Sequence, residues 1–145
     1  MVDLIIFASL LALGYFFGRM AETRHYKSII RREKALARIP AMATKIPDLS
    51  IQPQHIVLVT GSVVISVDYY KRFLAGLRNI IGGRIKSYES LVDRARREAI
   101  LRMKDQARVK GANLIFNVKL ETSSISQGRG IGSVEVLAYG TAFVD

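Results

Sequence analysis

The sequence predicts a small α+β domain of β-α-β-β order, preceded by one N-terminal transmembrane helix. Three observations lead to this prediction. The first is an uncharged apolar run, Leu4–Gly18. The second is a long amphipathic pattern near residues 87–110, and the third is a set of β-branched segments on both sides of it. A chain of 145 residues has room for one anchor and one such domain.

The anchor prediction depends on the length of the apolar run. Helix from Val2 to Ala21 would be about 30 Å long, which matches the hydrocarbon core of a bilayer. A cleaved signal peptide is the alternative interpretation. However, the first three residues are Met-Val-Asp, which carry no positive side chain, and residues 18–21 make a poor cleavage site.

The flanking charges predict an orientation and a class of partner. Seven basic and two acidic residues lie between Arg19 and Arg38, and nothing basic precedes the apolar run. The positive-inside rule therefore places the N-terminus outside and the C-terminal domain in the cytoplasm. The net charge is +10, and because the basic cluster adjoins the span, we expect membrane lipid rather than nucleic acid as the anionic partner.

The segment after the anchor changes character at Pro40. Residues 20–39 contain no Gly or Pro, so the anchor helix is expected to continue beyond the membrane. Prolines 40, 47 and 53 then indicate a semi-extended linker, or an arm that packs on a neighbour.

The folded domain begins near residue 55. Segments 55–60 and 62–67 are predicted strands, separated by a bulge or turn at Gly61. A short helix over residues 69–81 and a longer one over 87–110 should follow, the latter closed by Gly111. The longer helix has an apolar stripe suited to a sheet and a charged face that we expect to be solvated, and that stripe comprises Val92, Ala95, Ala99, Met103 and Ala107.

The last two predicted strands differ in their patterns. In the first, alternation places Leu114, Phe116, Val118 and Leu120 on one face. The strand Ser133–Val144 is apolar on both faces. One helical layer covers only one side of a sheet, so we expect the second apolar face to form an oligomer interface in a homo-oligomer. The interface residues would be Leu137, Tyr139 and Phe143.

The segment between the two predicted helices is the best candidate binding site. Its glycines expose backbone N–H groups, and its cations and a following helix N-terminus favour a small anion or a lipid headgroup. The other interpretation is a structural corner that needs glycine for its backbone angles. The residues concerned are Arg78, Gly82, Gly83, Arg84 and Tyr88.

We predict no metal site, no cofactor and no catalysis. The chain has no cysteine, and its two histidines, His25 and His55, are far apart in sequence. Soft metals prefer thiolate or clustered imidazole ligands. His55 is the only histidine in the folded domain, and nothing marks Glu89 or Asp93 as an acid–base pair beyond their place at a helix start.

Several segments of the domain resemble the YbjQ family of small bacterial proteins. They are LVTGSVVI (58–65), FLAGLRNIIGGRIKSYES (73–90), QARVKGANLI (106–115) and YGTAFV (139–144). The resemblance implies a dodecin-like β-α-β-β subunit assembled into ring-shaped pentamers. Some members carry a heavy-metal-binding label, which the residues of this chain do not support. One departure is Ser62, at a position that is commonly acidic in the family.

Together these observations predict three regions: an anchor (1–21), a juxtamembrane basic helix and Pro-containing linker (22–54), and a YbjQ-like domain (55–145). We expect a pentameric scaffold or interaction protein on the cytoplasmic face of the bacterial inner membrane. The alternative is a binding module for a small anion or lipid headgroup at the Gly82–Arg84 corner. The sequence does not name a client protein.

Overall fold

The computed structural model describes residues 2–45, 55–66, 86–125 and 133–144, the side chains of 86–88 and 125 excepted. The elements in order are α1 (Val2–Ala35), β1 (His55–Ser66), α3 (Lys86–Val109), β2 (Ala112–Ile125) and β3 (Ser133–Val144). The strands form one antiparallel sheet in the order β1-β3-β2. The α+β class with an N-terminal helix is therefore confirmed. The predicted helix over 69–81 lies outside the described residues.

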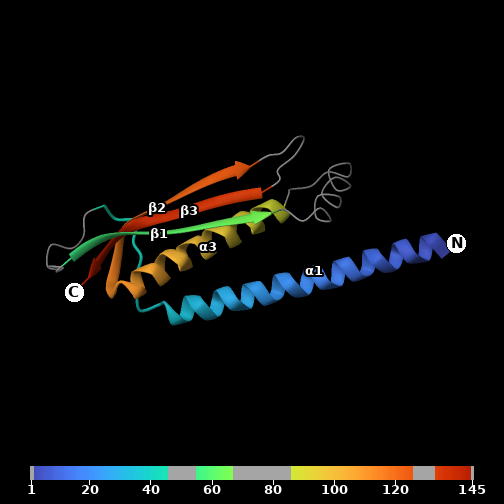
Figure 1. The fold of residues 1–145 in the computed structure, drawn as a ribbon, viewed down its shortest axis with the longest axis horizontal. Coiled ribbons are helices and arrows are strands. Elements are labelled where there is room, and N and C mark those ends of the chain that lie inside the picture. The colour runs from blue at the N-terminus through green and yellow to red at the C-terminus, as the bar shows by residue number, and fades with distance from the viewer. Residues whose placement is uncertain (1, 46–54, 67–85, 126–132, 145) are drawn as a thin grey trace.

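The molecule has three layers, with α3 between the sheet and α1 (Figure 1). The predicted stripe of α3 faces the sheet, and its Ala95, Ala99, Met103 and Ala107 are fully buried. They pack into one core with residues of β1 and β3 such as Val59. Because most of the stripe is alanine, the helix axis can lie close to the strands. Gly111 has a φ of 75° and follows the end of α3, as expected of a helix-terminating glycine.

Gly61 does not interrupt the first strand, contrary to the prediction. β1 runs unbroken from His55 to Ser66 and pairs with β3 without a register shift. Gly61 lies on the face toward α3, and a Cβ atom there would collide with the carbonyl oxygen of Ala99 and the backbone nitrogen of Met103. The glycine is therefore required by the close approach of α3 rather than by a turn.

A β-bulge in β2 overturns the predicted alternation of that strand. Phe116 pairs with Thr141 and Lys119 with Tyr139, so two residues of β2 lie opposite Gly140. Asn117 adopts a φ of 51° at this point. Leu114 and Phe116 consequently share the face of Phe143, whereas Val118 packs against the main core under α3. Sequence alternation cannot place residues beyond a bulge, because the extra residue exchanges the two faces.

The segment after α1 pairs with the outer edge of β2. Ala41 forms a parallel bridge with Ile115, and the N–H of Met42 donates to the carbonyl of Ile115 at 2.9 Å. The bulge is held from the same side, since Asn117 N–H donates to the carbonyl of Thr44 at 2.8 Å. This short extended segment, residues 40–44, is named the edge segment below. It attaches the end of α1 to the chain's own sheet.

Helix α1 is continuous through 34 residues, about 51 Å, and so extends well beyond the domain (Figure 1). The helix contains an 18-residue window with a mean hydropathy of 1.8, of which none is buried within the molecule. By length and composition it is able to cross a membrane, although a signal sequence would satisfy the same criteria. The helix does continue past the apolar run, as predicted.

Candidate interaction surfaces

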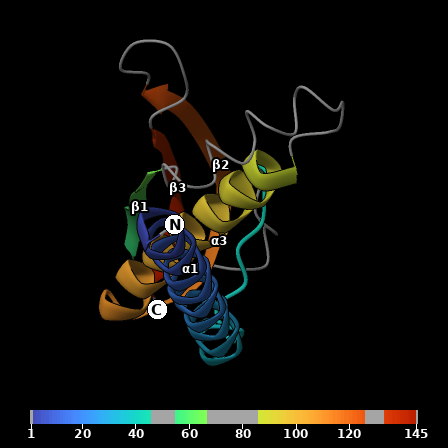
Figure 2. The same cartoon turned by 90° about the vertical axis from the view of Figure 1, so that its right-hand side faces the viewer.

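The charged face of α3 is solvated only in part: Asp93 and Arg96 are exposed, whereas the second half of α1 packs against Arg94, Arg97 and Glu98. The two helices run in the same general direction and cross at an angle (Figures 1 and 2). Ile29 of α1 and Leu36, the first residue after α1, form a small buried cluster with Leu101 of α3. Burial of three aliphatic side chains fixes α1 on the domain by the hydrophobic effect. The polar residues around the cluster then determine how α1 and α3 are aligned.

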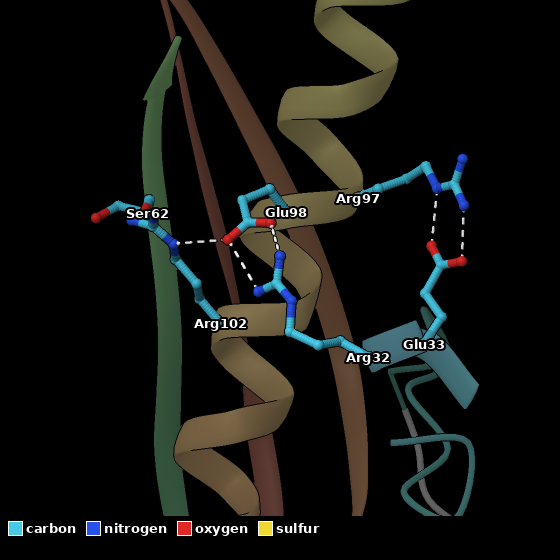
Figure 3. Close-up of polar contacts among 6 residues, drawn as sticks. All are labelled: Arg32, Glu33, Ser62, Arg97, Glu98 and Arg102. Carbon is cyan, nitrogen blue, oxygen red and sulfur yellow. Dashed lines mark hydrogen bonds and ion pairs between the residues drawn. The ribbon is translucent and has the colours of Figure 1, made fainter. Parts of the chain in front are cut away.

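Glu98 is the central polar residue of this contact (Figure 3). Its residue surface is only 5% exposed. Arg32 of α1 forms a two-pronged ion pair with it, one hydrogen bond of which measures 3.0 Å from Nη1 to Oε1. Arg102, one turn further along α3, donates from Nε to Glu98 at 3.2 Å and from Nη1 to the carbonyl of Ser62 at 2.7 Å. The resulting network connects α1, α3 and β1.

A second group of polar contacts lies nearer the start of α3. Arg97 donates from Nε and Nη2 to the two carboxylate oxygens of Glu33, both at 2.7 Å (Figure 3). The guanidinium of Arg97 also lies 6.0 Å from the ring centroid of Tyr26. Glu22 lies 3.8 Å from Arg94. Glu98 and Arg102 form an i,i+4 ion pair within α3, whereas Arg97 forms its ion pair with Glu33 of α1.

These contacts lower the pKa values of two carboxyl groups. Burial of Glu98 acts to raise its pKa, but the hydrogen bonds from Arg32 and Arg102 outweigh burial and hold the pKa below its ordinary value. The hydrogen bonds from Arg97 lower the pKa of Glu33. Both groups are therefore ionised at neutral pH, which keeps the α1–α3 ion pairs intact.

The face of the sheet opposite α3, named the open face, is partly apolar. No described helix lies over it (Figure 1). On β1 its apolar side chains are strongly exposed, Ile56 by 60%, Leu58 by 66% and Val64 by 56%. The cross-strand register places the three predicted interface residues of β3 on this same face. Leu137 is exposed and Tyr139 half-buried, whereas Phe143 is buried beside Phe116 at a centroid distance of 4.6 Å.

Parts of both sheet edges are already occupied by the chain itself. The edge segment pairs with β2, as described above. On the outer edge of β1, Gln106 Oε1 accepts a hydrogen bond from the N–H of Thr60 at 2.6 Å, beside the Arg102 contact to Ser62. Occupied edge groups are not available for strand pairing with another chain. The open face, by contrast, keeps exposed apolar side chains that a partner could cover.

The predicted binding corner falls outside the part of the chain that is described. Arg78, Gly82, Gly83 and Arg84 lie there, and Tyr88 is within α3 but without a described side chain. Among the described residues, no group of three His, Asp or Glu side chains could hold a metal ion. His25 lies half-buried in α1 and His55 is exposed at the start of β1. The described donor set therefore offers no site for a soft metal.

The comparisons with known proteins identify the family. A family model, YbjQ, described as "putative heavy-metal-binding", matches residues 38–145. The chain belongs to this family. It is 46% identical over 91 residues to the UPF0145 protein of Hahella chejuensis, covering 63% of this chain and 84% of that one. It is 45% identical over 87 residues to a UPF0145 protein of Dehalococcoides mccartyi, covering 60% of this chain and 80% of the relative.

A solved structure is similar to about three quarters of the chain. It is a protein of unknown function of the DUF74 family from Pediococcus pentosaceus, at a TM-score of 0.47 and 13% sequence identity. The match covers 73% of this chain and 96% of that one. The family match begins at residue 38, just before the edge segment, so the paired edge segment falls within the matched region while α1 precedes it.

Proposed function

We propose that this chain is a membrane-anchored scaffold. The first half of α1 crosses the bacterial inner membrane, and the α+β domain assembles on the cytoplasmic side through its open face into a homopentameric ring. The scaffold performs no catalysis. The observation that carries this proposal is the apolar character of the open face, because a second copy would remove Ile56, Leu58 and Val64 from water.

The anchoring part of the proposal is supported by the exposure of α1. Large apolar side chains are exposed along the first 17 residues. A helix that is apolar on all sides is stable when it is surrounded by protein or lipid. No described part of the domain covers this half of α1, so we assign lipid to that role.

Native mass spectrometry of the detergent-solubilised full-length protein tests the assembly. We expect a mass of five subunits, and a monomer would overturn the ring. Leu58→Asp should dissociate the assembly, because a carboxylate would then be buried at the apolar interface.

Val109→Asp is the matched control for Leu58→Asp. Val109 is 82% exposed and lies at the end of α3 rather than on the sheet. The same change of charge there should leave the subunit number unchanged. Equal dissociation by both variants would assign the effect to charge or to folding, and the open face would not be the interface.

A further inference from the structure

The second half of α1 has two opposite faces with different charge. The acidic residues Glu22 and Glu33 lie on the face that packs against α3, where they pair with Arg94 and Arg97. At 100° per residue, Lys27 lies about 160° around the helix from the buried Ile29. The basic residues of this opposite face are exposed, and they are Arg24, Lys27, Arg31 and Lys34.

A shallow groove of about 340 Å³ lies on this basic face where the apolar half of α1 ends. Its described lining residues are Phe16, Arg19, Met20, Thr23, Arg24 and Lys27. They are spaced by three and one along the helix, so they form a single stripe about 16 Å long. Phe16 and Met20 supply its apolar side chains, and Arg19, Arg24 and Lys27 supply three cations, two of which lie on the side toward the domain.

The polar contacts within the groove determine which groups are available to a ligand. The hydroxyl of Thr23 donates to the carbonyl of Arg19 at 2.9 Å and is used by the helix itself. One guanidinium nitrogen of Arg19 donates to the hydroxyl of Tyr15 at 2.9 Å. Among the described residues no carboxylate forms an ion pair with Arg24 or Lys27. The groups of the groove that are available to an anionic ligand are therefore its cations and not its hydroxyl.

We propose that this groove, residues 16–27 of α1, binds an anionic glycerophospholipid. The phosphate accepts hydrogen bonds from Arg19, Arg24 and Lys27, and an acyl chain lies against Phe16 and Met20. A free phosphate ion would leave the apolar side chains of Phe16 and Met20 without a partner, whereas a lipid matches both these and the cations. The inference rests on the proposed membrane anchor, because only then does the groove lie at the headgroup level.

Specific binding of a lipid at this site differs from a general attraction between the basic helix and anionic lipid, because it depends on position along the helix. Arg31 and Lys34 continue the basic stripe, but they lie about 15 and 20 Å beyond Ala21 along the axis. The Debye length at physiological ionic strength is about 8 Å. A phosphate at the level of Ala21 should therefore depend less on Arg31 or Lys34 than on Arg24 or Lys27, which lie only about 4.5 and 9 Å beyond Ala21.

Native mass spectrometry of the full-length protein, extracted from bilayers with equal phosphatidylglycerol and phosphatidylcholine, tests the site. We expect the wild type to retain phosphatidylglycerol preferentially. Arg24→Gln with Lys27→Gln should reduce that retention about tenfold or more. The control, Arg31→Gln with Lys34→Gln, removes the same charge from the same face and should change retention less than about twofold. Equal loss of phosphatidylglycerol from the two double variants would overturn the proposed site. The absence of a preference for phosphatidylglycerol in the wild type would do the same.

Two further readings of the same spectra complete the test. Displacement of the lipid by millimolar inorganic phosphate would identify the ligand as a free anion and also overturn the proposal. Subunit number is read independently of lipid retention. Five subunits without retained phosphatidylglycerol would reject the lipid site alone, whereas a monomer that retains it would reject the scaffold alone.

Discussion

Gly61 is the position where the backbone of β1 lies against the backbone of α3. Backbone atoms of Ala99 and Met103, together with Cβ of Arg102 at 2.9 Å, occupy the space that a Cβ atom would need. A flexible side chain could move aside, but the backbone of a packed helix cannot do so without displacing the whole element.

We expect Gly61→Ala to destabilise the protein by about 3 kcal/mol or to prevent folding, since overpacking of a tight contact typically costs 1–3 kcal/mol. Thermal unfolding followed by circular dichroism measures the effect. The control is Gly14→Ala, because nothing lies within 4 Å of a Cβ built at Gly14. Equal stability of Gly61→Ala and the wild type would show that α3 does not approach β1 this closely.

Glu98 gives the α1–α3 contact a dependence on pH. Its folded pKa is lowered, so its stabilising contribution is complete above the ordinary glutamate pKa of about 4.3 and is lost as the pH falls through the lower folded value. Glu33 has a lowered pKa and contributes in the same direction.

We expect Glu98→Gln to cost about 2 kcal/mol at pH 7, because hydrogen bonds to a charged group are lost. The variant should also lose less stability than the wild type between pH 5 and pH 3. Midpoints of thermal unfolding over this range measure both effects. Glu89→Gln, an exposed position on the same helix, should follow the wild-type curve. If the curve of Glu98→Gln also followed that of the wild type, the ion pair of Glu98 would be excluded.

At the scale of elements, the contact of α1 with α3 depends on a few side chains at helical spacing. Ile29 is fully buried, whereas the neighbouring Ile30 is 44% exposed. We expect Ile29→Ala to cost about 2–4 kcal/mol and Ile30→Ala less than about 0.5 kcal/mol. Thermal unfolding gives the ranking, and amide hydrogen exchange in α3 should increase for the first variant alone. Equal effects would mean that α1 does not dock in this orientation.

The sequence was sufficient to predict the elements that have a clear period. The apolar stripe of α3 and the two-faced strand β3 both agree with the structure. Their periods are complete within one element, so no knowledge of a partner is needed.

The differences arise where one element depends on another. Gly61 has the sequence signature of a turn, but its reason lies in α3, and the bulge of β2 is visible only once β3 and the edge segment are paired with it. The charged face of α3 had the pattern of a solvated surface. The sequence signal that α1 covers this face is a repeat of four and three residues. The repeat has too few apolar members to be decisive. Its members are Glu22, Tyr26, Ile29, Glu33 and Leu36.

The predicted interface residues of β3 also show this dependence on tertiary structure. Alternation correctly placed Leu137, Tyr139 and Phe143 on one face, but it could not show that Phe143 is buried by Phe116 of β2. Apart from Leu137, the exposed apolar residues of that face belong to β1, which the sequence had suggested only as a strand. The binding corner at residues 78–88 stays a prediction.

At the scale of the whole molecule, the proposal fixes which side of the membrane holds the domain. We expect a fluorescent-protein fusion at the C-terminus to fluoresce and an alkaline phosphatase fusion there to be inactive, because the basic residues after the span are retained in the cytoplasm. Active phosphatase would reverse the orientation. Release of the protein from membranes by carbonate at high pH would instead contradict the anchor itself.

Helix α1 is unbroken between its apolar half and its contact with α3. The rotation of the apolar half about the helix axis is therefore set relative to the domain. Each residue of the apolar half points in a set direction relative to the sheet, because no flexible joint separates the two halves. Inserting one residue after Ala21 would turn the whole span by about 100°, whereas inserting seven would nearly restore the original direction. In a ring of identical subunits, every span would then present the same side to its neighbours.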